Sequence, residues 1–350
     1  MAQDSQHSSS AASPAEHDPL PTVGALPYFS RFIHDETPIQ PPDWLSDIEL
    51  INHYTAVACR TITESEGPLR VLQYDMPREG LSHTFLLKQI LAFAAFHLAY
   101  LHPEHRRKYQ LLASQHQDVA LKGIMAGLAS TLTSSNCHAL YASSLLLTMS
   151  AFATYPRCDA DFLSFEPLDS LVDIFVLISG MATVLSSSRS DLKDGPLKDM
   201  IGRRPGPPKS EDYLHTIVDE LSKLRRWVER RFPDLEDEIA SITAEAITSL
   251  ADSVSTIQSQ HSADAAPGLR IIFLWPILMP AKYLRLVRQR EPISLAILAH
   301  YCVILRSTEA NYWFLEGWAK AVIDEVASSL SGFVHEEIIR WPVSMSNSLN

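Results

Sequence analysis

The sequence contains little glycine and no cysteine pattern that suits a metal or redox site. Only 12 of its 350 residues are Gly, and no G-x-G-x-x-G, Walker loop or G-x-S-x-G elbow occurs. We therefore expect neither a glycine-rich phosphate site nor a nucleophile elbow. The four cysteines, Cys59, Cys137, Cys158 and Cys302, include no Cys-x-x-Cys pair, so we expect reduced, mostly buried thiols rather than a zinc ribbon or a redox pair.

Positive charge is also scarce. The chain has 29 Lys and Arg against 41 Asp and Glu, a formal net charge of −12. A field of that sign does not steer a protein onto nucleic-acid phosphates or anionic lipids. Basic residues do gather at 106–108, 225–231 and 282–290, but each group shares its segment with apolar residues at helical spacing. We interpret these groups as solvated helix faces and expect no direct contact with nucleic acid.

Neither a leader peptide nor a membrane span is indicated. The first five residues have no basic start and no apolar core. Residues 123–156 contain no Asp, Glu, Lys or Arg, but the polar segment Thr131-Leu-Thr-Ser-Ser-Asn136 divides them, whereas a bilayer span needs about 20 mainly apolar residues. We expect two buried helices joined by a polar turn, in an intracellular protein of the cytoplasm or the nucleus.

The chain divides into a tail and one large domain. Residues 1–41 are rich in Ser and Pro without any period, which predicts a disordered tail. From residue 42 to 350 apolar residues recur at helical spacing and no long alternating run occurs. We therefore predict a single all-α, multi-helix domain over 42–350. Hydrophobic residues form 46% of the chain, enough for a sizeable core.

Several helices can be placed from local signals. Ser46 and Glu49 form a capping box, residues 83–101 are apolar almost all round, and Ser210 precedes another helix. The residues from Asn311 to Leu330 predict one last long helix. Arg270–Trp275 has the composition of a strand but no partner strand.

Groups that could hold a metal are sparse. The acidic run Asp234-Leu-Glu-Asp-Glu238 could bind magnesium, but acids in a first helical turn also oppose the positive end of the helix dipole. His102 and His105 have no third ligand nearby, and His335-Glu-Glu lacks the second His of a zincin. We therefore expect no metal and no cofactor.

Aromatic and methionine residues are more suggestive. Small residues between them can leave an apolar cavity, and methionine adapts to a lipophilic ligand. The same pattern also occurs in ordinary cores. The candidate ligand contacts are Phe93, Phe96, His97, Tyr100, Leu145, Met149, Phe152, Phe175 and Met181.

Several blocks of the sequence resemble a known regulatory domain. They include Leu50-Ile-Asn-His53-Tyr54, His83-Thr-Phe-Leu-Leu87, Phe175–Gly180 and, toward the C-terminus, Trp275-Pro276, Ala296-Ile-Leu-Ala-His300-Tyr301, Trp313-Phe-Leu-Glu-Gly-Trp318 and Trp341-Pro342. In order and spacing, over about 45–345, these blocks resemble the C-terminal regulatory domain of fungal zinc-cluster transcription factors of the sterol uptake control type.

The resemblance implies a helical module that regulates transcription. In sterol-responsive members an apolar pocket binds a sterol, and we add Trp313 and Trp318 to the candidate ligand contacts. The family's DNA-binding element is an N-terminal cluster of six cysteines with two zinc ions, and this sequence has only Cys59 before the central helix. Ser179 stands before Gly180, where relatives often carry Arg. We expect a protein that senses a lipophilic ligand or binds a partner, such as a complete transcription factor, without gripping DNA unaided.

An enzyme is the alternative. The same cavity could process a terpenoid or polyketide in fungal secondary metabolism, because a fold does not fix a function. His97, His300 and Glu316 are the candidate acid and base groups, since apolar surroundings shift pKa values. We consider a regulator more consistent with the sequence than an enzyme.

Overall fold

A computed structural model describes residues 44–129, 136–154, 166–201 apart from 188, 212–260, 265–332 and 334–348. Within these ranges every regular element is a helix and no strand occurs, which confirms the predicted all-α class. The predicted tail over 1–41 and the helix cap at Ser210 lie outside the described residues.

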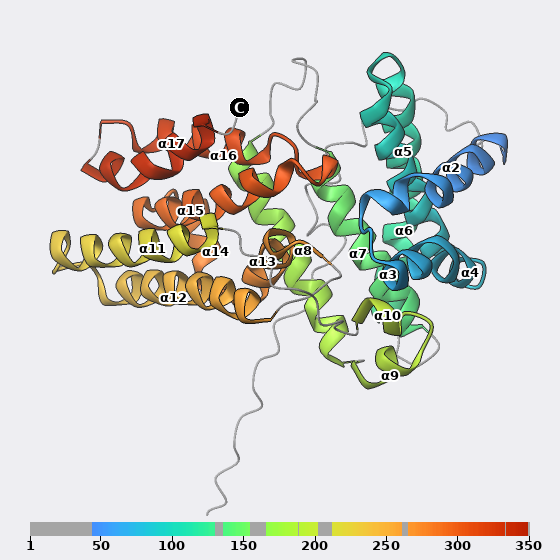
Figure 1. Cartoon of the computed structure of the whole chain (residues 1–350), viewed down its shortest axis with the longest axis horizontal. Helices are drawn as coiled ribbons and strands as arrows, with labels where there is room; N and C mark the ends of the chain where they lie inside the picture. Colours follow the sequence, from blue (N-terminus) through green and yellow to red (C-terminus); the bar gives the residue numbers. More distant parts are fainter. Residues whose placement is uncertain are drawn as a thin grey trace, which may run out of the picture.

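The N-terminal half of the described chain is built around two long antiparallel helices, α5 and α6. Figure 1 shows them on the right, with α2 beside them. The elements of this half are α2 (Trp44–Ala56), η2 (Ala58–Thr61), α3 (Glu66–Arg70), η3 (Val71–Asp75), α4 (Met76–Gly80), α5 (Thr84–Leu101), η4 (Pro103–His105), α6 (Arg106–Ala129) and α7 (Cys137–Ala153).

In the C-terminal half, α9 and α10 lie beside α3 and α7, and the helices from α11 onward stack on the other side of α8. In Figure 1, α8 runs through the middle of the molecule, and it packs on α7 as well as on α13, α14 and α16. The elements are α8 (Pro167–Ser187), α9 (Arg189–Asp194), α10 (Lys198–Ile201), α11 (Asp212–Arg231), α12 (Asp237–Ser259), α13 (Pro267–Leu278), α14 (Ala281–Arg288), α15 (Pro292–Glu309), η5 (Trp313–Leu315), α16 (Trp318–Leu330), η6 (Val334–Ile339) and α17 (Arg340–Ser348).

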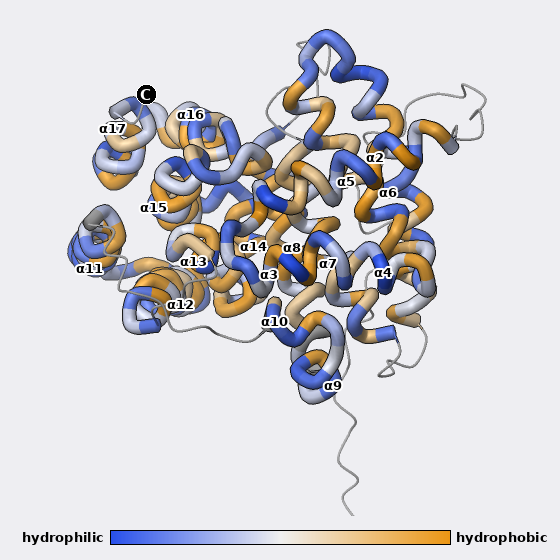
Figure 2. The backbone as a smooth tube through the Cα atoms, turned by 45° about the vertical axis from the view of Figure 1, so that its right-hand side comes forward, coloured by the Kyte–Doolittle hydropathy of each residue, from blue (hydrophilic) through white to orange (hydrophobic). Residues whose placement is uncertain are grey.

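The most apolar helices lie in the interior of the fold, where other helices surround them. α5 is the described helix that is long and apolar enough to cross a membrane, but 67% of it is buried inside the fold. It packs on α2, α6 and α7, as expected for a helix that is apolar all round. α15 is likewise buried along almost its whole length. Figure 2 shows hydrophobic backbone segments gathered along the central helices.

The structure corrects two local predictions and settles a third segment. α2 begins at Trp44, so Ser46 and Glu49 lie inside the helix and form no capping box. Arg270–Trp275 belongs to helix α13, in agreement with the all-α prediction, because helical packing on α12 and α15 outweighs its strand-like composition. The predicted helix over Asn311–Leu330 is broken before Trp318. Gly317 adopts a φ of 87° there, a left-handed conformation that glycine accepts readily.

The break at Gly317 gives α16 a new start, which a distant carboxylate caps. Oε1 of Glu309 in α15 accepts a hydrogen bond from the backbone N–H of Ala319 at 2.9 Å. Its other oxygen, Oε2, pairs with Arg306 at 3.0 Å. Burial nevertheless raises the pKa of Glu309 above its usual value. The Glu309 carboxylate thus satisfies a backbone N–H in the first turn of α16, and this hydrogen bond helps to hold the acid inside the fold.

Two prolines leave main-chain carbonyls of α13 without helical partners. Pro276 has no N–H, so it cannot donate to the carbonyl of Ile272, and Pro280 cannot donate to that of Pro276. Two hydroxyls from other helices replace these donors: Tyr301 of α15 donates to Ile272 O at 3.0 Å, and Ser179 of α8 donates to Pro276 O at 2.8 Å. Burial raises the pKa of the Tyr301 phenol well above its usual value, which keeps it a donor.

We expect Tyr301→Phe to lower the free energy of unfolding by about 1–3 kcal/mol, because it leaves the Ile272 carbonyl buried without a donor. Chemical denaturation followed by circular dichroism measures this change. Ser222→Ala is the matched control, since the Ser222 hydroxyl donates to Val218 O on an exposed helix face, and its cost should stay within about 0.5 kcal/mol. Equal effects of the two variants would contradict the role of Tyr301.

A charged network joins the start of α8 to α14, α15 and α16. Arg290, which follows α14, binds both carboxylate oxygens of Asp169 at 3.0 and 2.9 Å and also Glu325 at 3.0 Å. Glu325 in turn accepts from the backbone N–H of Leu168 at 2.8 Å. Burial works to raise the pKa of Asp169, yet the hydrogen bonds and charge of Arg290 bring it below its usual value. Arg290 holds this position with a φ of 58°, unusual for a residue other than glycine.

Arg290→Ala should destabilise the protein by about 1.5–3 kcal/mol, the range for hydrogen bonds to charged groups. Arg288→Ala serves as the control, because Arg288 makes a single, more exposed pair with Asp173 and should contribute less than about 1 kcal/mol. Thermal and denaturant unfolding of both variants provide the comparison. A larger loss for the Arg288 variant would refute this ranking.

Candidate functional site

The eleven candidate ligand contacts fall into separate packing groups. Four of them, Phe93, His97, Tyr100 and Trp313, lie together, and two others, Phe152 and Trp318, meet elsewhere. Phe175 joins a third group of aromatic rings. Among the remaining candidates, Phe96, Met149 and Met181 are buried, and Leu145 packs against the core. Their assignment as ligand contacts stays a prediction.

The first group joins α5 to η5, the segment before α16. The Trp313 ring lies 4.8 Å from that of His97, 5.4 Å from Tyr100 and 5.5 Å from Phe93, between ring centroids. The Trp313 indole donates to Oγ1 of Thr61 at 3.0 Å. These separations fall within the range of about 4.5–7 Å between ring centroids that packed aromatic pairs prefer.

The side chains of the other two groups also form contacts between helices. The Trp318 indole donates to the carbonyl of Phe152 at 2.7 Å, near the end of α7 where carbonyls lack helical partners. Phe175 meets Trp275 and Tyr301 edge to face, with centroids 5.9 and 5.2 Å apart. Each candidate aromatic residue of these groups therefore has a demonstrable packing contact in the fold.

His97 of the first group forms a direct hydrogen bond with His53 of α2. Nε2 of His53 and Nδ1 of His97 are 2.9 Å apart. Burial, and then the neighbouring His53, lower the pKa of His97 to about 4. The pKa of His53 is also lowered, by burial and then by His102. Both rings are therefore neutral at pH 7, where one nitrogen can donate and the other accept.

His97 should make the protein sensitive to acid. Its pKa is about 4 in the folded state and about 6.5 when unfolded, so the unfolded chain binds the proton first as the pH falls. Between those values the free energy of unfolding should decline by about 3 kcal/mol on account of this residue. Unfolding of wild type and His97→Gln at pH 7 and 4.5 tests this. An unchanged pH dependence in the variant would exclude His97 as the cause.

His116 makes a second acid-sensitive contact with α2. Its Nε2 lies 3.2 Å from Oδ1 of Asp47, and Lys88 binds Oδ2 of the same carboxylate at 3.0 Å. Burial, followed by Lys88, lowers the pKa of His116 to about 4. Together with the His53–His97 bond, these contacts fix α2 on α5 and α6.

The acid and base candidates His97 and His300 lie in different surroundings. His300 bonds through Nδ1 to the carbonyl of Ala296 at 2.8 Å and stacks on Trp341. His97 contacts instead His53, Tyr100 and Trp313. Glu316 follows η5 at the start of α16. The contacts of His97 and His300 do not bring the two imidazoles together.

The charged runs have structural partners. Glu238, in the first turn of α12, pairs with Lys282 at 2.8 Å and with Arg285 at 3.4 Å. His102 pairs with Glu104 on the exposed side of η4. In the described part of the chain no group of three or more His, Cys, Asp or Glu side chains is placed to hold a metal ion.

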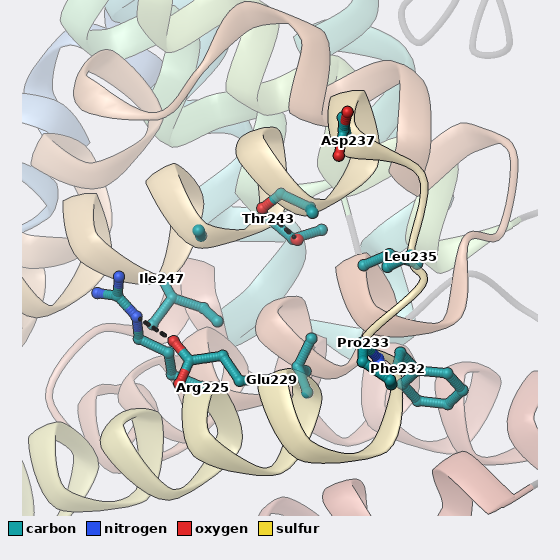
Figure 3. A pocket seen from close by; sticks show the side chains of 11 residues that line it. Arg225, Glu229, Phe232, Pro233, Leu235, Asp237, Thr243 and Ile247 are labelled. Atoms are coloured by element: carbon teal, nitrogen blue, oxygen red, sulfur yellow. Dashed lines mark hydrogen bonds and ion pairs between the residues drawn. The ribbon is translucent and has the colours of Figure 1, made fainter.

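A pocket of about 340 Å³ lies between α11 and α12, and its lining residues are not among the ligand contacts predicted from the sequence. Thr243 and Ile247 form its buried floor, and exposed charged residues form its rim (Figure 3). The small residues of α12 at helical spacing were the available signal, but alanines at such positions occur in any packed helix. The lining residues are Arg225, Val228, Glu229, Phe232, Pro233, Leu235, Asp237, Ala240, Thr243, Ala244 and Ile247.

Sequence comparison relates this chain to two fungal proteins. No protein-family model matches the chain. The chain is 24% identical over 327 residues to a Zn(2)-C6 fungal-type transcription factor of Gibberella zeae, covering 86% of this chain and 61% of that protein. It is 27% identical over 310 residues to Sterol uptake control protein 2 of Candida albicans, covering 82% and 41%.

The chain thus spans about three fifths and two fifths of the lengths of these two relatives. The alignments nevertheless run through most of the helical body described above. Over most of its length, the chain is homologous at low identity to a Zn(2)-C6 fungal transcription factor and to a sterol uptake control protein.

Proposed function

We propose that this chain is a regulator of transcription whose helical body receives a signal from a lipophilic molecule or a protein partner. The observation that carries the proposal is the alignment of more than four fifths of the chain with two fungal proteins named for transcription and sterol uptake control. A nuclear place of action follows from such a role. Recognition of DNA would come from a second factor bound to this body, consistent with the net charge of −12.

The architecture offers a route by which such a signal could spread. Trp313 ties its segment to Thr61 in the N-terminal half, and Trp318 of α16 ties to Phe152 of α7. α8 contacts helices of both halves. A ligand or partner that moves helices of one half would therefore also displace helices of the other half, because packed cores transmit strain.

The test is a transcription reporter in yeast. The chain is fused to a heterologous DNA-binding domain, and reporter output is compared with that of the DNA-binding domain alone, with and without an inhibitor of sterol synthesis. We expect the fusion to change the output and the inhibitor to shift it. Output equal to that of the DNA-binding domain alone in both conditions, with the fusion present at equal abundance on a blot, would refute the proposal.

An enzymatic role lacks comparable support. The proposed acid and base groups His97 and His300 contact different neighbours, whereas a general acid and base must reach one substrate. No observation in the described residues favours catalysis over regulation, so we do not propose an enzyme.

A further inference from the structure

We propose that the pocket between α11 and α12 binds a compact, uncharged lipophilic molecule that carries a hydrogen-bond donor. This site is separate from the aromatic groups predicted from the sequence, since none of their residues lines it. The inference deepens the proposed function and rests on it for its biological meaning, but binding is measured independently of any reporter.

The hollow exists because α12 presents small side chains to α11. Ala240, Thr243 and Ala244 follow at helical spacing, and Val228 of α11 and Phe232, directly after α11, line the other wall. Three such small residues cannot fill the space between two helices. The volume of about 340 Å³ lies at the lower end of the range for small-molecule sites, so the ligand must be compact.

The pocket is graded from an apolar interior to a charged rim. Thr243 and Ile247 on the floor are buried, at 1% and 4% exposure. Val228, Phe232 and Leu235 on the walls are half-buried, and Pro233 lies at the edge. Figure 3 shows Phe232, Pro233 and Leu235 along the turn that joins the two helices. An apolar lining with a few polar groups is the usual anatomy of a ligand site.

The polar groups of the pocket mostly accept hydrogen bonds. The Thr243 hydroxyl already donates to the carbonyls of Ile239 and Ala240, at 2.8 and 3.2 Å, so its oxygen is left to accept. The carboxylates of Glu229 and Asp237 are acceptors as well. A ligand with an N–H or O–H group therefore matches the Thr243 oxygen in the interior and the carboxylates at the rim.

The rim disfavours an anionic ligand. Arg225 is the cation of the lining, and it donates to Glu229 at 3.1 Å and to Thr248 at 3.5 Å. Asp237 adds a second carboxylate, so the lining carries one more negative than positive charge. An acid would have to displace Glu229 from Arg225 and then face Asp237, and like charges in close contact are repulsive.

Two fluorescent probes of nearly the same shape test the site. N-phenyl-1-naphthylamine is uncharged and carries an N–H donor, and 1-anilinonaphthalene-8-sulfonate is the same skeleton with a sulfonate. We expect saturable binding of the amine, and binding of the sulfonate weaker by about tenfold or more. Asp237→Asn should narrow that difference. Equal affinities of the two probes for the wild-type chain would overturn the assignment of ligand charge.

Matched substitutions place the binding in the pocket. Ala244→Phe fills the hollow and should weaken amine binding by about tenfold or more, while Ser241→Phe, on the exposed face of α12, should leave it nearly unchanged. If Ala244→Phe alters the unfolding curve, Ala240→Leu tests the same wall. Unchanged binding in the filled variants would disprove the site, whatever the reporter shows, and normal binding with a silent reporter would instead reject the regulatory role.

Discussion

The fold depends on finding donors for main-chain carbonyls that helices cannot satisfy by themselves. Pro276 and Pro280 leave the carbonyls of Ile272 and Pro276 without helical N–H groups. Tyr301 and Ser179 supply the missing hydrogen bonds from two other helices. Since an unsatisfied buried carbonyl is costly, α8, α13 and α15 must hold one particular arrangement, and the prolines that interrupt a helix thereby specify its neighbours.

Aromatic side chains carry out the same task elsewhere in the core. The Trp318 indole donates to the carbonyl of Phe152 near the end of α7, and the Tyr283 hydroxyl adds a donor to the carbonyl of Ser294 within α15. A Tyr or Trp side chain can bury a large apolar surface and still place one polar atom on a distant backbone group. The aromatic residues that suggest a ligand cavity in the sequence are thus also the residues that hold the helices together. Composition alone does not separate these two roles.

Charged side chains form two different kinds of contact in this molecule. The Arg290 network binds the start of α8 to its neighbours, whereas the ion pair of Arg225 and Glu229 lies at the rim of an open pocket. A partly buried cation that shares several hydrogen bonds adds stability, and a solvated pair beside a hollow adds little. The second kind is the pair that the proposed ligand site uses to disfavour an anion.

The sequence by itself determined the all-α class, the buried character of residues 83–101 and the kinship with fungal regulators. Each of these is written in local periodicity or in the order of short blocks, so no distant contact is needed to read it. Only the tertiary structure decided that Gly317 breaks the last predicted helix, that His53 bonds to His97, and that a pocket opens beside Ala244. These features depend on which side chains of remote segments lie in contact. The spacing of residues along the chain does not give the distances between such segments.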